Sequence, residues 1–216
     1  MSRGPELPPA FAQDTRAAVR RCVFGHPDAP KRVVLTPIRS FFEPLAAGLV
    51  RHGGWWPSAG RDDVLVVLVP QSGAVLDAVC CLEPGTEIVV AGLTGSLGRL
   101  PLGAIVEVEA ALWYGRRFAR SSRQPMRFPP AVVDHVECLA ESYHRWSTSV
   151  ADCVDMETAL VYGAAQAQTM TATALLIVSD VLPDQPFFAV EPGAWRGHTA
   201  ELVRTVAELV GLSLVS

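Results

Sequence analysis

The stretch Val154-Asp155-Met156-Glu157-Thr158-Ala159 and the later run Ala174-Leu175-Leu176-Ile177-Val178-Ser179-Asp180 decide the fold class of this chain. The later run is apolar, of strand length and closed by a carboxylate, so it predicts a buried strand with Asp180 at its carboxyl end. Residues 158–168 are rich in Ala and Gln and contain no Pro, which predicts a helix that Glu157 opens. Because open α/β sheets bind ligands beyond the carboxyl ends of their strands, Glu157 and Asp180 can converge on one pocket.

Spacing alone leaves two interpretations of these carboxylates open. In the structural interpretation, the charge of Glu157 stabilises the start of a helix and Asp180 caps a turn. In the functional interpretation, both side chains belong to a pocket, where burial and neighbouring charges shift pKa values for chemistry.

The segment resembles the nucleoside phosphorylase and nucleosidase family, which includes methylthioadenosine/S-adenosylhomocysteine nucleosidases. The resemblance is good over residues 150–184 and weaker upstream. It rests on Asp155-Met156-Glu157-Thr158-Ala159, a helix, and then Ile177-Val178-Ser179-Asp180. The resemblance implies that Met156 packs on a sugar, with Asp155 beside it, and that Glu157 accepts hydrogen bonds from the sugar hydroxyls. It also implies that Ser179 and Asp180 supply the acid that protonates the purine at N7.

A looser resemblance, to small nucleosidases linked to hopanoid synthesis, rests on the Pro-containing apolar stretch that runs from Val181 to Phe188. In that stretch, Phe187-Phe188 are candidates to close over an apolar substituent of the ligand.

A second segment, Gly92-Leu93-Thr94-Gly95-Ser96-Leu97-Gly98, predicts a turn after a buried strand. Glycines let the backbone approach a ligand closely. The segment resembles the family's base- and sugar-binding loop, which adds Gly92, Thr94 and Gly95 to the substrate-binding residues. Phosphorolytic members carry an Arg and a Ser or Thr where this chain has Val90 and Leu93. Neither side chain binds an oxyanion, so the sequence disfavours phosphorolysis.

The first strand and turn depart from the family pattern. In the nucleosidases this region carries a Glu that positions the attacking water, and the alignment puts Phe41 at that position. Glu43 is two residues on, about 200° away around a helix. Phe41 is therefore predicted as an apolar pocket wall or as a core residue, and simple hydrolysis is in doubt.

Composition predicts one globular α/β domain. Half of the 216 residues are apolar and 19% are charged, with a net charge of −4, which argues against a general nucleic-acid binder. No apolar run is long enough to span a membrane, and the start of the chain has no signal-peptide core. The five cysteines are odd in number, without a CxxC pattern, and His135 and Cys138 have no second ligand pair. We therefore expect a cytoplasmic protein without a metal or other cofactor.

The predicted fold is phosphorylase/hydrolase-like, with a single mixed central β-sheet flanked by helices. Residues 1–31 are predicted to be a loosely attached N-terminal extension, and residues 32–216 a single nucleosidase-like domain. Strands are expected at 32–38, 63–70, 86–91, 102–108 and 131–136, and helices at 40–50, 74–82, 139–147 and 198–211.

Three features of the sequence have two possible interpretations each. The arginine-rich segment, residues 116–127, is either a solvated surface loop or a site for an anionic group. The Trp55-Trp56 pair is either packed under a loop or part of a subunit contact or pocket rim. Tyr143 and Trp146 are both candidates for an aromatic contact with the base.

The leading hypothesis for function is cleavage of a purine N-ribosidic bond without phosphate, in a homodimer or larger homo-oligomer as the resemblance implies. One alternative is a diverged family member that binds a nucleoside-like ligand without turnover. Another is different acid-assisted chemistry in specialised metabolism.

Overall fold

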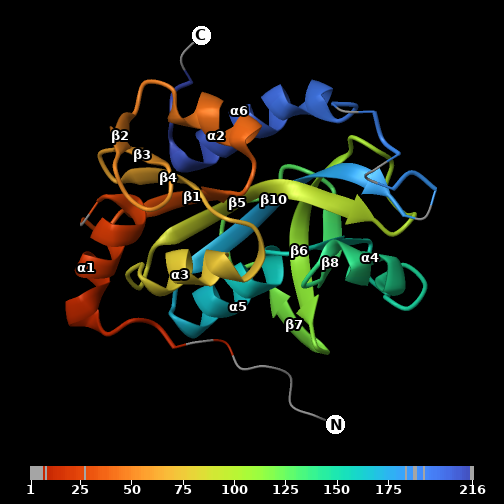
Figure 1. Ribbon diagram of the computed structural model, residues 1–216, viewed down its shortest axis with the longest axis horizontal. Helices are drawn as coiled ribbons and strands as arrows, with labels where there is room; N and C mark the ends of the chain where they lie inside the picture. The colour runs from red at the N-terminus through yellow and green to blue at the C-terminus, as the bar shows by residue number, and fades with distance from the viewer. Residues whose placement is uncertain are drawn as a thin grey trace.

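All strands in the described residues belong to one sheet (Figure 1). The computed structural model describes residue 7 and residues 9–26, 28–182, 184–186, 189–191 and 193–214. The strands are β1 (Arg32–Thr36), β2 (Val50–His52), β3 (Ser58–Arg61), β4 (Val64–Leu68), β5 (Glu87–Ser96), β6 (Ile105–Trp113), β7 (Arg116–Ala119), β8 (Pro130–His135), β9 (Cys153–Asp155) and β10 (Thr171–Val181). Their order is β10-β6-β8-β9-β5-β1-β4-β3-β2, with β7 paired to β6.

Strand β10 is hydrogen-bonded to two neighbours, β6 in antiparallel and β5 in parallel orientation. Strands β10, β6, β8, β9 and β5 therefore close into a barrel, and β1, β4, β3 and β2 continue from β5 as an open sheet. The predicted mixed α/β fold with a helix-flanked sheet is confirmed. The sheet is not one open layer, because β10 pairs with β5 from Thr171 to Val181 and with β6 over Leu175 to Ile177.

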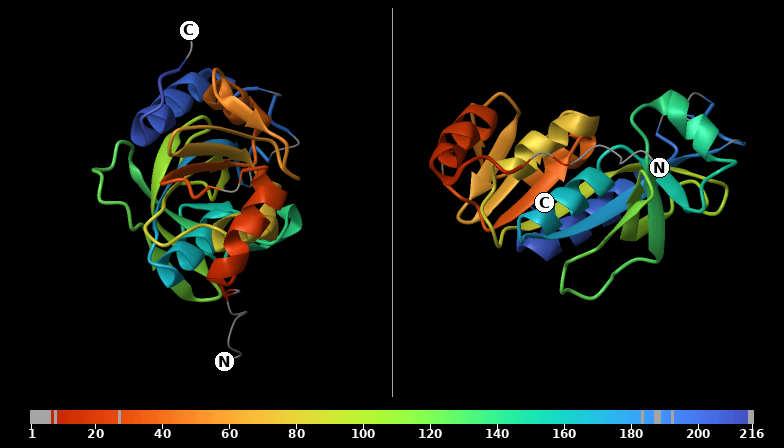
Figure 2. Two further views of the ribbon diagram at one scale, coloured as in Figure 1. Left: turned by 90° about the vertical axis from the view of Figure 1, so that its left-hand side faces the viewer. Right: turned by 90° about the horizontal axis from the view of Figure 1, so that it is seen from below.

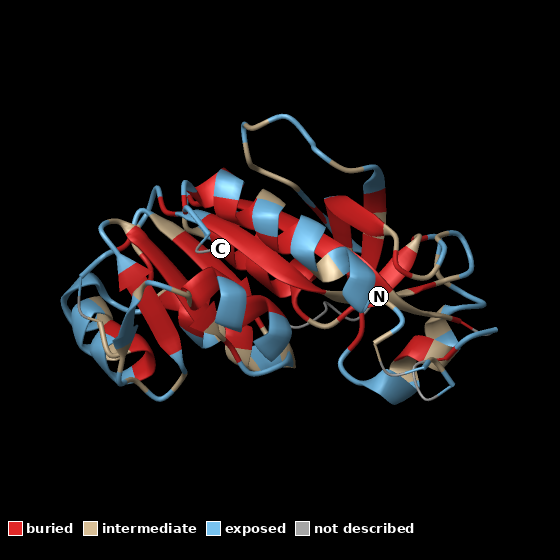
Figure 3. Ribbon diagram, turned by 90° about the horizontal axis from the view of Figure 1, so that it is seen from above, coloured by how far each residue is buried: buried red, intermediate tan, exposed pale blue. Residues whose placement is uncertain are grey.

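Helices cover both faces of the sheet (Figure 2). On one face lie α1 (Gln13–Phe24), α3 (Val75–Cys80) and α5 (Thr158–Ala167); on the other lie α2 (Arg39–Ala46) and α6 (Thr199–Val210); α4 (Leu139–Arg145) follows β8 beside the barrel. Val33 and Leu35 of β1 belong to one core cluster and Val34 to the other. Figure 3 shows the strands buried along most of their length, as expected for a sheet covered on both faces.

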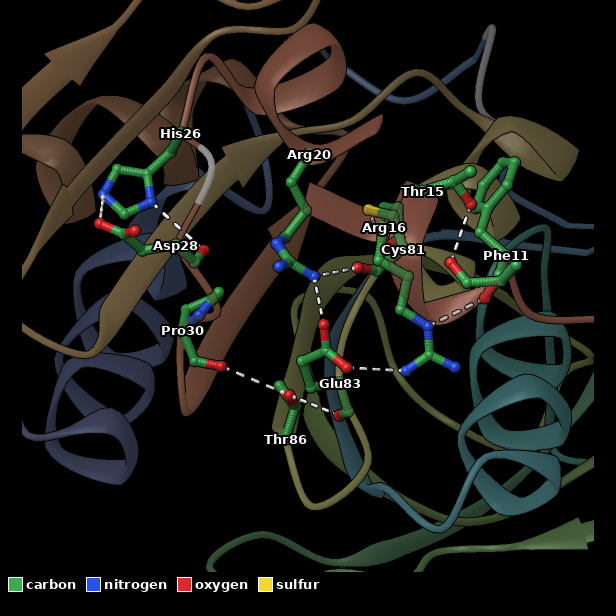
Figure 4. Close-up of polar contacts among 12 residues, drawn as sticks. Phe11, Thr15, Arg16, Arg20, His26, Asp28, Pro30, Cys81, Glu83 and Thr86 are labelled. Carbon is green, nitrogen blue, oxygen red and sulfur yellow. Dashed lines mark hydrogen bonds and ion pairs between the residues drawn. The ribbon is translucent and has the colours of Figure 1, made fainter. Parts of the chain in front are cut away.

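Helix α1 is anchored by ion pairs and by apolar packing (Figure 4). The Nη1 atoms of Arg16 and Arg20 lie 2.9 and 2.8 Å from the two carboxylate oxygens of Glu83. At the end of the helix, Val23 and Phe24 are buried in the core. The predicted loose attachment of residues 1–31 is therefore wrong for α1. The domain boundary at residue 32 stays a prediction.

Residues 47–61 differ from the prediction, which was a helix over residues 40–50 followed by a loop that contains Trp55 and Trp56. Helix α2 ends at Ala46, and Gly48 has a φ of 75°, a left-handed conformation that turns the chain into the antiparallel hairpin β2–β3. In the connection between these strands, Trp56 packs against the core and Trp55 is 76% exposed. The two tryptophans therefore have opposite environments.

The predicted glycine-rich turn after the third strand is a strand as far as Ser96. Strand β5 continues through Gly92 because β10 pairs with it there, and at Gly95 and Ser96 β9 pairs with its other edge. At Gly95 and Ser96, the backbone is therefore paired within the sheet on both edges.

The arginine-rich segment is held to the barrel by a buried ion pair. Arg120 Nε lies 2.7 Å from Glu107 Oε1, and Glu107 is 1% exposed. Arg127 donates its backbone N–H to the other oxygen of Glu107 over 2.8 Å, and its guanidinium pairs with Glu208 at the surface. These contacts support a structural role for the two arginines.

None of the helices among the described residues is long and apolar enough to cross a membrane. Among the same residues, no group of three or more His, Cys, Asp and Glu side chains is arranged to hold a metal ion.

Candidate functional site

A cavity of about 260 Å³ lies where several strands end beside the starts of α4 and α5. Strands β1, β4, β5 and β10 run in parallel, so the segments that follow them reach the same edge of the sheet. The polar lining consists of Gln71, Thr94, Ser142, Asp155, Glu157, Ser179 and Asp180. The rest of the lining is Pro37, Ile38, Leu93, Gly95, Val136, Leu139, Val154 and Met156. Most of the predicted site residues therefore meet at one cavity.

Asp180 lies next to an irregularity in β10. The pairing with β5 passes from Val178 opposite Thr94 to Asp180 opposite Gly95, which leaves Ser179 as the extra residue of a bulge. The Ser179 hydroxyl donates a hydrogen bond to Asp180 Oδ1 over 2.7 Å. Burial raises the pKa of Asp180, and this hydrogen bond opposes the shift only in part. A raised pKa favours the protonated carboxyl, which is the form that a general acid needs.

Gly95 leaves room for the carboxyl group of Asp180. A Cβ atom at position 95 would lie 3.0 Å from Asp180 Oδ2 and 3.4 Å from Val154 Cγ2. Its neighbour Thr94 is 2% exposed and donates its hydroxyl hydrogen bond to the Val154 carbonyl over 2.7 Å. The two residues therefore shape the wall of the cavity and hold β9 against β5.

Glu157 precedes the first turn of α5 and is 7% exposed. Its Oε1 atom accepts a hydrogen bond from the Ser72 N–H over 2.7 Å. Burial raises the pKa of Glu157, while the backbone N–H groups of Ser72 and Met156 act in the opposite direction. The carboxyl group thus has hydrogen-bonded partners and also faces the cavity.

Asp155 lines the cavity, but its oxygens serve the start of α5. They accept hydrogen bonds from the backbone N–H and the hydroxyl of Thr158. Burial, and next the charge of Glu157, raise the pKa of Asp155 to about 7. These hydrogen bonds give Asp155 a helix-capping role that the sequence did not predict, and its contact with substrate stays a prediction.

Phe41 and Gly92 lie outside the cavity lining. The Phe41 ring is fully buried in the core cluster of α2 and α6 and meets Trp195 edge-on, with ring centroids 5.9 Å apart. Phe41 was predicted as either a pocket wall or a core residue, and in the structure it is a core residue. Gly92 lies within β5, where a Cβ atom would lie 3.2 Å from Leu176 Cδ2, so it faces a strand neighbour rather than the cavity.

The cavity also contains residues that sequence analysis did not select. Ile38 and Gln71 follow β1 and β4, so their position after parallel strands was a usable signal. Leu139 and Ser142 belong to α4, whose approach to the cavity has no local signal in the sequence.

The two aromatic candidates of this region differ in environment. Tyr143 packs with Met156 in a small apolar cluster next to the cavity. Trp146 is 44% exposed and is not among the lining residues. The predicted Phe187-Phe188 closure lies outside the described residues.

The solved structures that this chain resembles in fold include nucleosidases. The sequence matches no protein-family model, and no curated protein matches it. Similar structures belong to the nucleoside phosphorylase/nucleosidase superfamily, including its 5′-methylthioadenosine/S-adenosylhomocysteine nucleosidase (MTAN) members. The fold of this chain is theirs, so the resemblance seen in the sequence is confirmed at the level of the fold.

Three of these structures illustrate the similarity. AMP nucleosidase from Bacteroides thetaiotaomicron has a TM-score of 0.67 at 17% identity, over 91% of this chain and 98% of that one. A mutant futalosine hydrolase from Helicobacter pylori has a TM-score of 0.64 at 12% identity, over 84% of this chain and 100% of that one. MTAN from Chlamydia trachomatis bound to MTA has a TM-score of 0.62 at 14% identity, over 83% of this chain and 94% of that one.

Proposed function

We propose that this chain is an enzyme that cleaves the N-ribosidic bond of a purine nucleoside. Asp180 is the general acid on the base, and Glu157 holds the sugar hydroxyls. The observation that carries the proposal is that two largely buried carboxyl groups with raised pKa values line one cavity, one from the start of α5 and one from the end of β10. A fold shared with nucleosidases, including structures bound to MTA and to adenine, supports a nucleoside-like ligand.

The two carboxyl groups suit the charges that develop during this reaction. As the C–N bond breaks, its electrons go to the purine and the sugar becomes oxocarbenium-like. A protonated Asp180 transfers its proton to the purine, which then leaves as a neutral base. Glu157 in its ionised form, favoured by the Ser72 and Met156 N–H groups, accepts hydrogen bonds from the sugar hydroxyls and stabilises the positive sugar.

Water is the proposed acceptor of the sugar. Phosphate requires charge-assisted donors, and the lining residues that the structure describes include no Lys, Arg or His. Val90 is buried in the core and Leu93 adds an apolar side chain to the lining. Three carboxyl groups in the same lining further disfavour a phosphate dianion.

The test measures release of free base by chromatography from adenosine, methylthioadenosine, S-adenosylhomocysteine and inosine, with and without phosphate. We expect release that does not need phosphate and that Asp180→Asn abolishes. A phosphate requirement with ribose-1-phosphate as product would contradict water as the acceptor. Equal release by the wild type and Asp180→Asn would remove Asp180 as the acid.

The environment of Phe41 favours a second candidate function, a nucleoside-binding protein without turnover. The position that carries the water-orienting Glu in the resemblance is a core phenylalanine here. Absence of base release across the panel, with nucleosides still raising the melting temperature, would support this candidate. Absence of both effects would favour different acid-assisted chemistry on another ligand.

The assembly and location of the protein remain predictions. The resemblance implies a homodimer or larger homo-oligomer, which light scattering on the purified chain would test. A cytoplasmic location and the lack of nucleic-acid binding rest on composition alone.

A further inference from the structure

The turn that follows β4 donates a backbone hydrogen bond to the carboxyl group of Glu157. The Ser72 N–H donates to Glu157 Oε1 over 2.7 Å, across 85 positions of sequence. None of the ion pairs found within the described residues includes Glu157, and its charged form is favoured by the backbone N–H groups of Ser72 and Met156. A hydrogen bond from one distant backbone group is thus a main determinant of how this carboxylate is oriented.

The backbone of Ser72 is in an unusual conformation for a residue with a side chain. Its φ is 62°, in the left-handed region, although the next residue is Gly73. A non-glycine residue keeps this conformation only where the surrounding contacts hold it, and such residues cluster at functional sites. Gln71 on the other side lines the cavity, so the turn is part of the site.

We propose that Ser72 is a positioning residue for Glu157. Its backbone N–H fixes Oε1, leaves Oε2 to accept a hydrogen bond from the ligand, and favours the ionised carboxyl group against the effect of burial. The inference rests on the proposed function, because it assigns Glu157 a charged role toward the sugar. Ser72 acts on Glu157 through its backbone N–H, so the identity of its side chain is of secondary importance.

The test replaces the amide N–H of residue 72 with an ester oxygen, by installing lactic acid at that position. Ser72→Ala is the matched control, because it has the same side chain and keeps the N–H. Ser72→Gly also keeps the N–H and relaxes the backbone. The readouts are the pKa of Glu157, from the ¹³C shift of its carboxyl carbon assigned with Glu157→Gln, and the pH dependence of KM and kcat for base release.

We expect the ester to raise the pKa of Glu157 above its value in Ser72→Ala, because a donor that favours the charged form is lost. KM should rise about tenfold, with a smaller change in kcat, and the acidic limb of the KM profile should move to higher pH. Ser72→Ala and Ser72→Gly keep the N–H that donates to Glu157, so the ester is compared with Ser72→Ala rather than with the wild type. An unchanged pKa and KM in the ester variant would overturn the inference.

A second measurement does not depend on the ester variant folding. In the wild type, the ¹H shift of the Ser72 amide should titrate with the pKa of Glu157, and this titration should vanish in Glu157→Gln. A Ser72 amide that does not titrate would also overturn the inference. If the wild type releases no base but the amide titrates, the proposed function fails while the hydrogen-bonded role of Ser72 stands.

Discussion

One carboxylate lies at each end of β10, the buried Glu107 near its start and the partly buried Asp180 near its end, and their surroundings differ. Near the start, the Thr173 hydroxyl donates to Glu107 Oε1 over 3.0 Å, and Arg120 Nε lies 2.7 Å from the same oxygen. The backbone N–H of Arg127 donates to Glu107 Oε2. Every oxygen of Glu107 therefore has a partner, and its charge is balanced by a guanidinium.

At the other end, Asp180 accepts a hydrogen bond from the neighbouring Ser179 hydroxyl and borders the cavity. None of the ion pairs among the described residues includes Asp180 or Glu157, and burial raises the pKa of both. Burial of a carboxylate therefore does not by itself mark a functional site. Asp180 differs from Glu107 in two ways: it has no cationic partner among the described residues, and it lines a cavity that a ligand can fill.

Asp180→Asn should have the largest effect on activity, a loss of base release of about 10³-fold, because general acid catalysis contributes on that order. The free energy of unfolding of Asp180→Asn should not be lower than that of the wild type. The raised pKa means that the native state favours the protonated form, so wild-type Asp180 destabilises the fold as pH rises through its pKa, and a neutral Asn avoids that cost. Chromatography and urea unfolding measure the two effects. Asp184→Asn, an exposed carboxylate nearby, is the control and should keep full activity.

At the other end of the strand, Arg120→Ala should have the opposite effect: it should lower stability and leave activity unchanged. It leaves Glu107 charged and buried without its cation, which costs about 3–5 kcal/mol of unfolding free energy. Base release per folded molecule should be unchanged. Arg117→Ala is the matched control, because its ion pair with Glu109 is exposed and should cost less than about 1 kcal/mol. A loss of activity in folded Arg120→Ala would show that the two ends are coupled.

Gly95→Ala should reduce base release about tenfold, because the new methyl group would displace the Asp180 carboxyl by a few tenths of an ångström. Gly92→Ala, in the same strand, meets only a methyl group of Leu176 and should keep its activity. The measurement is kcat/KM for base release in both variants. Equal activities would mean that the position of Asp180 tolerates the shift, and that the cavity is less restrictive than the geometry indicates.

Asp155 gives a prediction for stability as a function of pH. Its pKa in the folded chain is about 7, above the usual value of 3.8, so the folded state binds the proton more tightly. Its contribution to stability is complete below the usual pKa and is lost as the pH rises to about 7. Asp155→Asn should remove this slope, which is at most about 1.4 kcal/mol per pH unit. Urea unfolding at several pH values tests it, and parallel curves for the two proteins would contradict it.

The site could be predicted from the sequence in part. The carboxyl ends of buried strands and the start of a helix are recognisable from local patterns, and the family resemblance then singled out Glu157 and Asp180. Other residues at the cavity, including the partner of Glu157, were not predicted. Ser72 is 85 positions from Glu157, and Ser142 reaches the cavity from α4, so neither has a signal in the residues around the carboxylates.

By itself the sequence determined the order and type of most elements, the apolar interior and two of the carboxylates that line the cavity, because these depend on periodicity and on residues close together in the chain. Only the tertiary structure decided that β10 closes a barrel, that Phe41 belongs to the core, and that Arg120 pairs with Glu107. These outcomes depend on strand register and on packing between distant segments, for which a local pattern carries no information.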